Sequence, residues 1–338
     1  MGESIVNRKS SIRQLFDSHA LWLSMLIGIL GYKWFLPLKP TLPWLIFFML
    51  FFTFCKVNPL DLRLHKWHGV VLFVQIFLSL ATYAGILYLT EDRILAQGLL
   101  MCFIMPTATA APIIAGKLGG SIQNLTTFTL LSNFATSIIV PALFPLVYPA
   151  AEKAFVPAFL LILSRVAPLL LVPFFSAWLL RIIYQWRKKQ DFVLSKRAAQ
   201  IPFYLWVASI IVLSSVVTQT VVSSYDTLLS TMLWLLLGSF FACLVQFGLG
   251  KWIGYVLPAA SKGTDYQDVL INPAAAPKTM EGVSSITAGQ AFGQKNTSLG
   301  VWMAQTYLHP MAALGAAAYI IWQNLFNSVQ LFVAAHKK

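Results

Sequence analysis

Ten apolar runs follow one another along this chain, most of them close to the length that crosses a bilayer. They lie at about 20–38, 42–56, 69–90, 94–117, 121–146, 158–183, 202–222, 228–256, 283–308 and 311–333. Charged residues make up only 10% of the 338 positions, compared with roughly 25% in soluble domains. Because lipid cannot satisfy backbone N–H and C=O groups, such runs must be helical. The chain is therefore predicted to be an all-α polytopic membrane protein.

The lysines and arginines between these runs are concentrated in every second connection. The basic set comprises Arg8, Lys9, Arg13, Lys56, Arg63, Lys66, Lys117, Arg187, Lys188, Lys189, Lys196, Arg197, Lys262, Lys278, Lys337 and Lys338. The other connections hold only Lys39, Arg93 and Lys153. Basic loops face the cytoplasm. We expect a multi-pass protein of the cell (inner) membrane with cytoplasmic tails at 1–18 and 334–338.

Ten spans divide into two halves of five, at 19–149 and 150–333. An odd number of spans in each half forces the second half to enter the membrane upside down, as in many secondary transporters. We therefore predict ten transmembrane helices arranged as two inverted five-helix repeats.

The fourth span of each half contains a segment that weakens a helix. In the first half Pro106 and Pro112 remove backbone donors, and in the second half the polar stretch 289–296 interrupts the run. Each alone is compatible with a proline kink or a polar patch, but broken helices at matching positions indicate a transporter's binding site. The candidate site residues at the breaks are Thr107, Thr109, Gln290, Gln294, Lys295, Asn296 and Thr297.

Lys295 is the most unusual of these residues. A lysine near bilayer depth costs about 2.5–3.5 kcal/mol and needs a partner or a task. Every Asp and Glu lies in a terminus, a predicted loop or a span end, so no buried carboxylate pairs with it. Three partners stay open: backbone carbonyls, an anionic substrate, or the loss of its own proton. The free N–H groups of a broken helix also attract anions.

These segments carry a family resemblance. The stretch 293–299, Pro310 and the stretch 318–328 resemble the C-terminal signature of the bile acid:sodium symporter family, and 105–141 resembles its fourth and fifth spans. The resemblance implies a panel-plus-core fold in which the two broken helices cross. It also implies secondary active transport, by alternating access, of carboxylate-bearing organic anions such as bile acids, keto acids or pantothenate-like acids.

The resemblance carries over to the family's sodium ligands only in part. Gln75, Thr129 and Ser132 match ligand positions, whereas a Ser-Asn pair is replaced by Ala111-Pro112, a glutamate by Ala291 and a glutamine by Lys295. Hard cations need oxygen ligands without an adjacent positive charge. We therefore expect transport that is not classically sodium-dependent, with the coupling ion open between H⁺ and Na⁺. A sodium-coupled symporter, an uncoupled uniporter and, more distantly, a membrane receptor or scaffold are the alternatives.

Other classes are not indicated. Cys55, Cys102 and Cys243 lack the spacing of metal ligands or disulfides, no catalytic motif is present, and the net charge of +13 is scattered through short loops. We expect no enzyme activity, no cofactor, no metal site and no nucleic acid. The expected partners are a small organic anion and the bilayer. Tyr319 is interpreted as an interfacial anchor and Gln246 as an interhelical hydrogen bonder.

Overall fold

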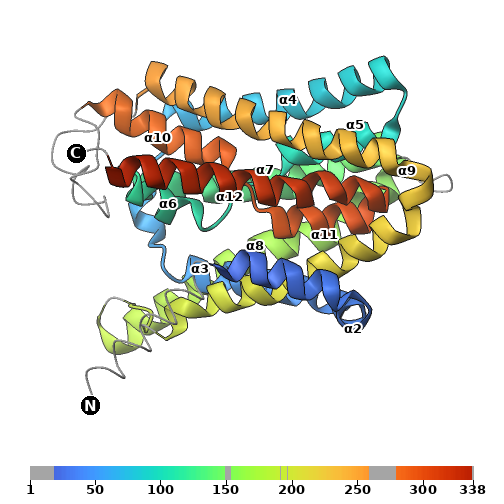
Figure 1. The fold of residues 1–338 in the computed structure, drawn as a ribbon. Coiled ribbons are helices and arrows are strands. Elements are labelled where there is room, and N and C mark those ends of the chain that lie inside the picture. Colours follow the sequence, from blue (N-terminus) through green and yellow to red (C-terminus); the bar gives the residue numbers. More distant parts are fainter. Residues whose placement is uncertain (1–18, 149–153, 191, 196, 259–278, 337–338) are drawn as a thin grey trace, which may run out of the picture.

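The structure is a computed structural model that describes residues 19–148, 154–190, 192–195, 197–258 and 279–336 (Figure 1). This part of the chain is helical and contains no strand. Its elements are a helix over His19–Leu30, α2 (Tyr32–Phe35), η1 (Leu36–Thr41), α3 (Leu42–Phe54), η2 (Pro59–Asp61), α4 (Lys66–Thr90), α5 (Arg93–Ile104), α6 (Ala111–Lys117), α7 (Ile122–Val147), α8 (Phe155–Lys188), η3 (Ala198–Gln200), α9 (Ile201–Val256), α10 (Met280–Gly293), α11 (Thr297–Tyr307), η6 (Pro310–Ala312) and α12 (Ala313–His336). The all-α prediction is confirmed. The predicted tail 1–18, residues 337–338 of the C-terminal tail and the boundary at 149–150 lie outside the described residues.

Six of the described helical segments are long and apolar enough to cross a membrane. They are Tyr32–Phe54, Lys66–Thr90, Ile122–Val147, Phe155–Lys188, Ala198–Ser224 and Leu228–Val256. A span needs about 20 residues, and α5, α6, α10 and α11 are shorter because the chain breaks between them. The protein is therefore a multi-pass membrane protein.

The apolar run predicted as one span at 20–38 is divided. Its first helix ends at Leu30, and the chain continues through α2 and the 3₁₀ segment η1 before α3 begins. Pro37 and Pro40 lie within η1, where a regular α-helix would lose two backbone donors. The apolar segment long enough to span is instead Tyr32–Phe54, so the prediction of one span at 20–38 was wrong, whereas the predicted second run at 42–56 matches α3.

The helix α9 contains two spans in one run of 56 residues. Leu228, with φ −125° and ψ 19°, interrupts its helical geometry. Figure 1 shows the chain reversing direction there, so that α9 forms a V with a first arm before Leu228 and a second arm after it. The two predicted spans at 202–222 and 228–256 correspond to these arms.

The second arm of α9 packs closely against α10. A Cβ atom at Gly254 would lie 2.2 Å from the carbonyl oxygen of Ser284, and one at Gly250 would lie 2.5 Å from that of Ala288. Small residues four apart let helices approach backbone to backbone in lipid, where no hydrophobic force drives them together. This contact fixes α10, and with it the second break.

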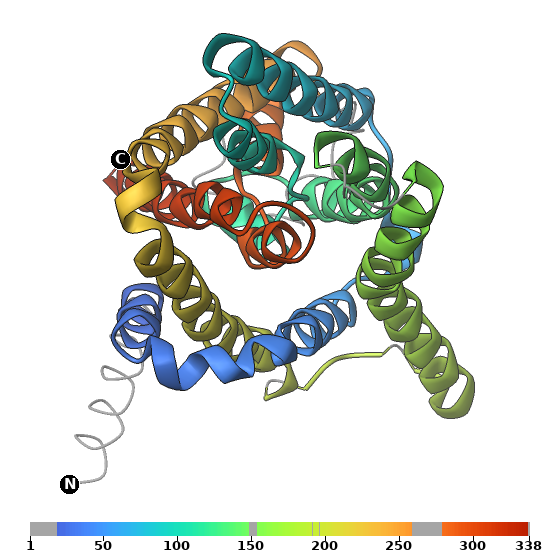
Figure 2. The same cartoon turned by 90° about the vertical axis from the view of Figure 1, so that its right-hand side faces the viewer.

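Viewed along the helices, the bundle separates into two groups (Figure 2). An outer group contains α2, α3, α8 and the first arm of α9, which pack on one another. A core group contains α4 to α7, the second arm of α9 and α10 to α12. The two breaks lie in the core group.

Candidate functional site

The two broken helices meet at their breaks. Thr107, between α5 and α6, pairs with Lys295, between α10 and α11, in an isolated antiparallel β-bridge. The N–H of Ala108 donates to Gln294 O at 2.9 Å, and that of Asn296 donates to Pro106 O at 2.8 Å. Backbone that leaves a helix at membrane depth must find partners inside the protein. Each break supplies them to the other.

The last backbone carbonyls of α5 lie in the interior, where they accept hydrogen bonds from side chains on α4, on α9 and on the break after α10. Cys102 O accepts from Gln246 Nε2 at 3.1 Å, Phe103 O from Lys295 Nζ at 3.0 Å, and Ile104 O and Met105 O from Gln75 Nε2 at 3.3 and 3.1 Å. The last carbonyls of a helix carry partial negative charge and favour donors or cations. Here protein donors already occupy these positions.

The end of α10 is capped in the same way. Thr107 Oγ1 donates to Ala291 O at 2.6 Å, and Tyr319 Oη donates to Gly293 O at 2.7 Å. Tyr319 is fully buried, so its interpretation as an interfacial anchor was wrong. The crossing is thus a cluster of helix ends tied together by side chains.

Lys295 belongs to this cluster as a hydrogen-bond donor. Its side chain is 1% exposed, and Nζ lies 5.0 Å from the ring centroid of Phe292 as well as on Phe103 O. Its own N–H donates to Gln323 Oε1 at 2.9 Å. No ion pair with Lys295 exists among the residues that the structure describes. Of the partners open at the sequence level, the backbone carbonyl is the one that it contacts here.

The break also presents the N-terminus of α11. Asn296 caps this helix by accepting a hydrogen bond from Leu299 N on Oδ1 at 3.2 Å. Asn296 is 5% exposed, and its Nδ2 has no hydrogen-bond partner among the residues that the structure describes. A buried amide N–H without a partner costs free energy. An unpaired donor therefore stands beside the positive end of a helix dipole.

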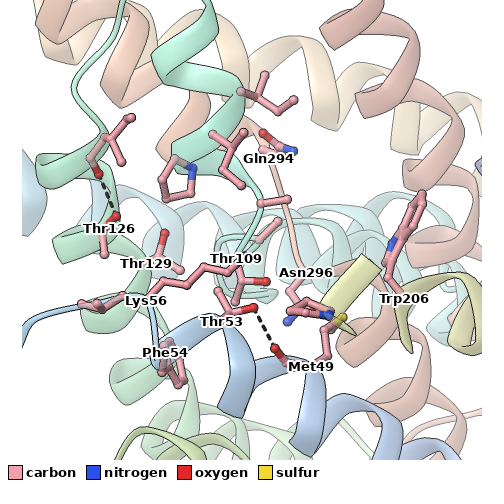
Figure 3. A pocket seen from close by; sticks show the side chains of 18 of the residues that line it. Met49, Thr53, Phe54, Lys56, Thr109, Thr126, Thr129, Trp206, Gln294 and Asn296 are labelled. Atoms are coloured by element: carbon pink, nitrogen blue, oxygen red, sulfur yellow. Dashed lines mark hydrogen bonds between the residues drawn. The ribbon is translucent and has the colours of Figure 1, made fainter. Parts of the chain in front are cut away.

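A cavity of about 910 Å³ lies between the outer group and the core group and reaches the crossing (Figure 3). Its core wall carries most of the polar lining residues, among them Thr109, Gln294, Asn296, Thr297, Ser298, Gln323, Asn324 and Asn327. Its outer wall is mostly apolar and includes Met49, Phe54, Pro202, Phe203 and Trp206. Lys56, Asp61, Ala199 and Leu331 also line it, at the end of the bundle where α3 and α12 end and α9 begins. The cavity suits a solute with one polar and one apolar side.

The predicted site residues fall into two groups. Thr109, Thr129, Gln294, Lys295, Asn296 and Thr297 line the cavity. The other four, Gln75, Thr107, Ser132 and Gln290, do not line the cavity and instead make hydrogen bonds within the core. Gln75 donates to Ile104 O and Met105 O, and Thr107 donates to Ala291 O. Ser132 accepts from Thr107 N at 3.0 Å, and Gln290 donates to Gln330 Oε1 at 3.4 Å.

Sequence reasoning missed several residues at the site. Gln323, Trp206 and Lys56 line the cavity. Gln323 lay in the stretch that carries the family resemblance and Lys56 in the basic set that indicates topology, but neither was assigned to the site, and Trp206 carried no signal. Gln246 was assigned to interhelical hydrogen bonding, and the structure shows that its target is the end of α5.

At the end of α5, the positions that match sodium ligands place hydrogen-bond donors on the helix carbonyls. The matched Gln75 turns its Nε2, not an oxygen, toward the carbonyls at the end of α5, and Lys295 places an ammonium on Phe103 O. Hard cations prefer several oxygen ligands without a neighbouring positive charge. Among the described residues no group of three His, Cys, Asp or Glu side chains offers a metal site.

No protein-family model matches this chain, and no curated protein matches it.

Proposed function

We propose that this protein is a secondary transporter of carboxylate-bearing organic anions and a divergent member of the bile acid:sodium symporter family. The observation that carries this proposal is the cavity of about 910 Å³ that ends where two broken helices cross. Non-helical backbone at membrane depth occurs where it is buried in protein or lines a cavity, and in secondary transporters matching helix breaks form the binding site. In the proposed topology, ten spans form two inverted five-helix repeats with both termini in the cytoplasm.

The polarity of the deep cavity supports an anionic substrate. The N-terminus of α11 and the unpaired Nδ2 of Asn296 offer donors and a positive dipole. Asp61, the only carboxylate among the described lining residues, lies at the mouth and is exposed. The apolar outer wall matches an amphipathic carboxylate.

The capping of α5 supports transport without sodium. Lys295 supplies a fixed positive charge at the helix end, and Gln75 and Gln246 supply neutral donors beside it. In this proposal the ammonium of Lys295 takes over the role of a coupling cation and stays bound through the cycle. Proton coupling, in which Lys295 gives up and regains its proton, is the variant that the experiment below distinguishes.

Alternating access requires that the opposite end of the bundle be closed when this one is open. At that end the core group contacts the outer group through Gln305 Nε2, which donates to Thr220 Oγ1 at 3.1 Å. Within the core group Thr231 Oγ1 donates to Asp92 Oδ2 at 2.6 Å, and His309 N donates to Gln97 Oε1 at 3.1 Å. The contact between Gln305 and Thr220, which joins the two groups, represents the closed side of an inward-open state.

The test is uptake by the purified full chain in proteoliposomes. Pyruvate, pantothenate and cholate are offered separately under a sodium gradient, a proton gradient and neither, with protein-free liposomes as the control. We expect uptake of at least one carboxylate without sodium stimulation. Uptake that needs sodium would indicate the sodium-coupled symporter, and downhill flux insensitive to both gradients would indicate the uniporter. Transport of none of the three acids would contradict the proposal.

A further inference from the structure

The charges that line the cavity are not equally available to a solute. Lys56, Asp61 and Lys295 are the charged residues among the described lining. The ammonium of Lys295 is directed to Phe103 O, and its side chain is 1% exposed. Lys56 and Asp61 are exposed at the mouth. An entering anion therefore meets Lys56 as the first cation.

Lys56 is held in place at this mouth. It lies just beyond Cys55, which caps α3, and its Nζ donates to Ala199 O in η3 at 2.9 Å. Figure 3 shows it close to Thr53 and beside the cavity. An ammonium has three N–H donors, so this single hydrogen bond leaves others for a solute.

We propose that Lys56 is the residue that selects for anions at the cavity mouth. It attracts the carboxylate of the substrate and binds it before the substrate moves to the N-terminus of α11. This role rests on the proposed function. Charges at the rim of a binding site act mainly on the association rate and its dependence on salt.

Asp61 places a negative charge at the same mouth as the positive charge of Lys56. It lines the same mouth, five positions along the chain, and its carboxylate repels anions. Removing Lys56 and removing Asp61 should therefore act in opposite directions. A lysine that only tied α3 to η3 would give no such opposition.

The first experiment measures the cavity charge without any substrate. Thr53→Cys places a thiol on the cavity wall, one helical turn from Lys56, while the three native cysteines are buried. Its labelling rates are measured with an anionic methanethiosulfonate, which carries a sulfonate, and with a cationic one, which carries a quaternary ammonium. The unsubstituted protein gives the background.

We expect the ratio of anionic to cationic labelling rates to fall about tenfold in Lys56→Gln and to rise in Asp61→Asn. Lys56→Arg should keep the ratio of the unsubstituted mouth. Salt at about 0.5 M should reduce the differences in this ratio among the variants, because it screens exposed charges. Equal ratios in the unsubstituted mouth, Lys56→Gln and Asp61→Asn would overturn the proposal and leave Lys56 as a tie between α3 and η3.

The second experiment applies the same substitutions to uptake of cholate, pantothenate and pyruvate. Lys56→Gln should raise KM about tenfold with little change in kcat, and Asp61→Asn should lower KM. Failure of all uptake in the unmodified protein, with the labelling ratios as expected, would reject the transport function but not the anion-selective mouth. Normal uptake with unchanged KM in both variants would reject the role of Lys56.

Discussion

Thr107 and Lys295 are bridge partners, and the side chain of each caps the helix that the other one follows. Thr107 follows α5 and donates to Ala291 O near the end of α10, whereas Lys295 follows α10 and donates to Phe103 O near the end of α5. The two breaks are therefore one reciprocal unit. Loss of either side chain leaves a buried carbonyl of the opposite helix without that donor.

Thr107→Val should test this reciprocity through stability. Valine keeps the shape of threonine but removes the donor to Ala291 O, so we expect a loss of about 1–3 kcal/mol. Thermal unfolding in detergent measures it. The control is Thr306→Val, because Thr306 donates only to Trp302 O in its own helix and should change stability by less than about 0.5 kcal/mol. Equal effects of the two substitutions would argue against a special role for Thr107.

Lys295→Gln should reduce uptake at least tenfold without creating sodium dependence. Glutamine is shorter and neutral, so Phe103 O loses both its donor and its adjacent positive charge. Adding Ala291→Glu to this variant restores a carboxylate and an amide at the crossing, and some sodium-stimulated uptake is expected. Sodium-stimulated uptake in the unmodified protein that Lys295→Gln leaves unchanged would refute both the fixed-cation and the proton-carrier versions. Uptake uncoupled from a proton gradient, with anion exchange preserved, would favour the proton carrier.

The breaks themselves were predictable from the sequence because their causes are local. Pro106 and Pro112 remove donors within one run, and the polar segment around Lys295 weakens the other, so the helix ends at Ile104 and Gly293 followed from nearby residues. The first apolar run was misjudged for a related reason. Hydropathy averages over Pro37 and Pro40, whereas the backbone responds to each proline separately.

The capping partners could not be predicted in the same way. Lys295 and Phe103 are 192 positions apart, and Gln246 and Cys102 are 144 apart. A hydropathy pattern indicates that a polar group is buried but not which carbonyl it reaches, because that depends on how the helices pack. Tyr319 shows the consequence, since the same residue type that anchors span ends is here buried on Gly293 O.

Gly254→Ala should separate α10 from the second arm of α9. The new methyl group would lie 2.2 Å from Ser284 O, so the helices must move apart, at a cost of about 1–3 kcal/mol. The matched control is Gly248→Ala in the same arm, where the added carbon meets no atom within 4 Å and alanine should stabilise the helix by about 0.5–1 kcal/mol. Thermal unfolding compares the two. The same sign for both would contradict the close contact.

Anion preference at the mouth should decline with alkaline pH. Burial lowers the pKa of Lys56 below the value of 10.5 that is ordinary for lysine. The ammonium is present below this pKa and is lost as the pH rises through it, so attraction fades at a lower pH than for a free lysine. The ratio of anionic to cationic labelling at Thr53→Cys, measured between about pH 7 and 10.5, follows it. Lys56→Arg should hold its ratio throughout because arginine stays charged. A flat profile with Lys56 present would show that its charge does not govern the mouth.

Substitutions of Asn296 distinguish an effect on protein stability from an effect on substrate binding. Its Oδ1 caps α11, while its Nδ2, at the positive end of the helix dipole, has no partner within the described part of the chain. Serine is as good an N-cap as asparagine, so Asn296→Ser should change stability by no more than about 0.5 kcal/mol. It removes the amide donor, and a hydrogen bond to a charged group contributes about 1.5–3 kcal/mol, which corresponds to a loss of at least about tenfold in kcat/KM for anion uptake. Asn296→Asp keeps the cap oxygen but puts a carboxylate in place of the donor, and uptake should be lost further through repulsion. Uptake by Asn296→Asp at the unmodified rate, in protein that elutes as a folded species, would mean that the substrate anion does not bind at the start of α11.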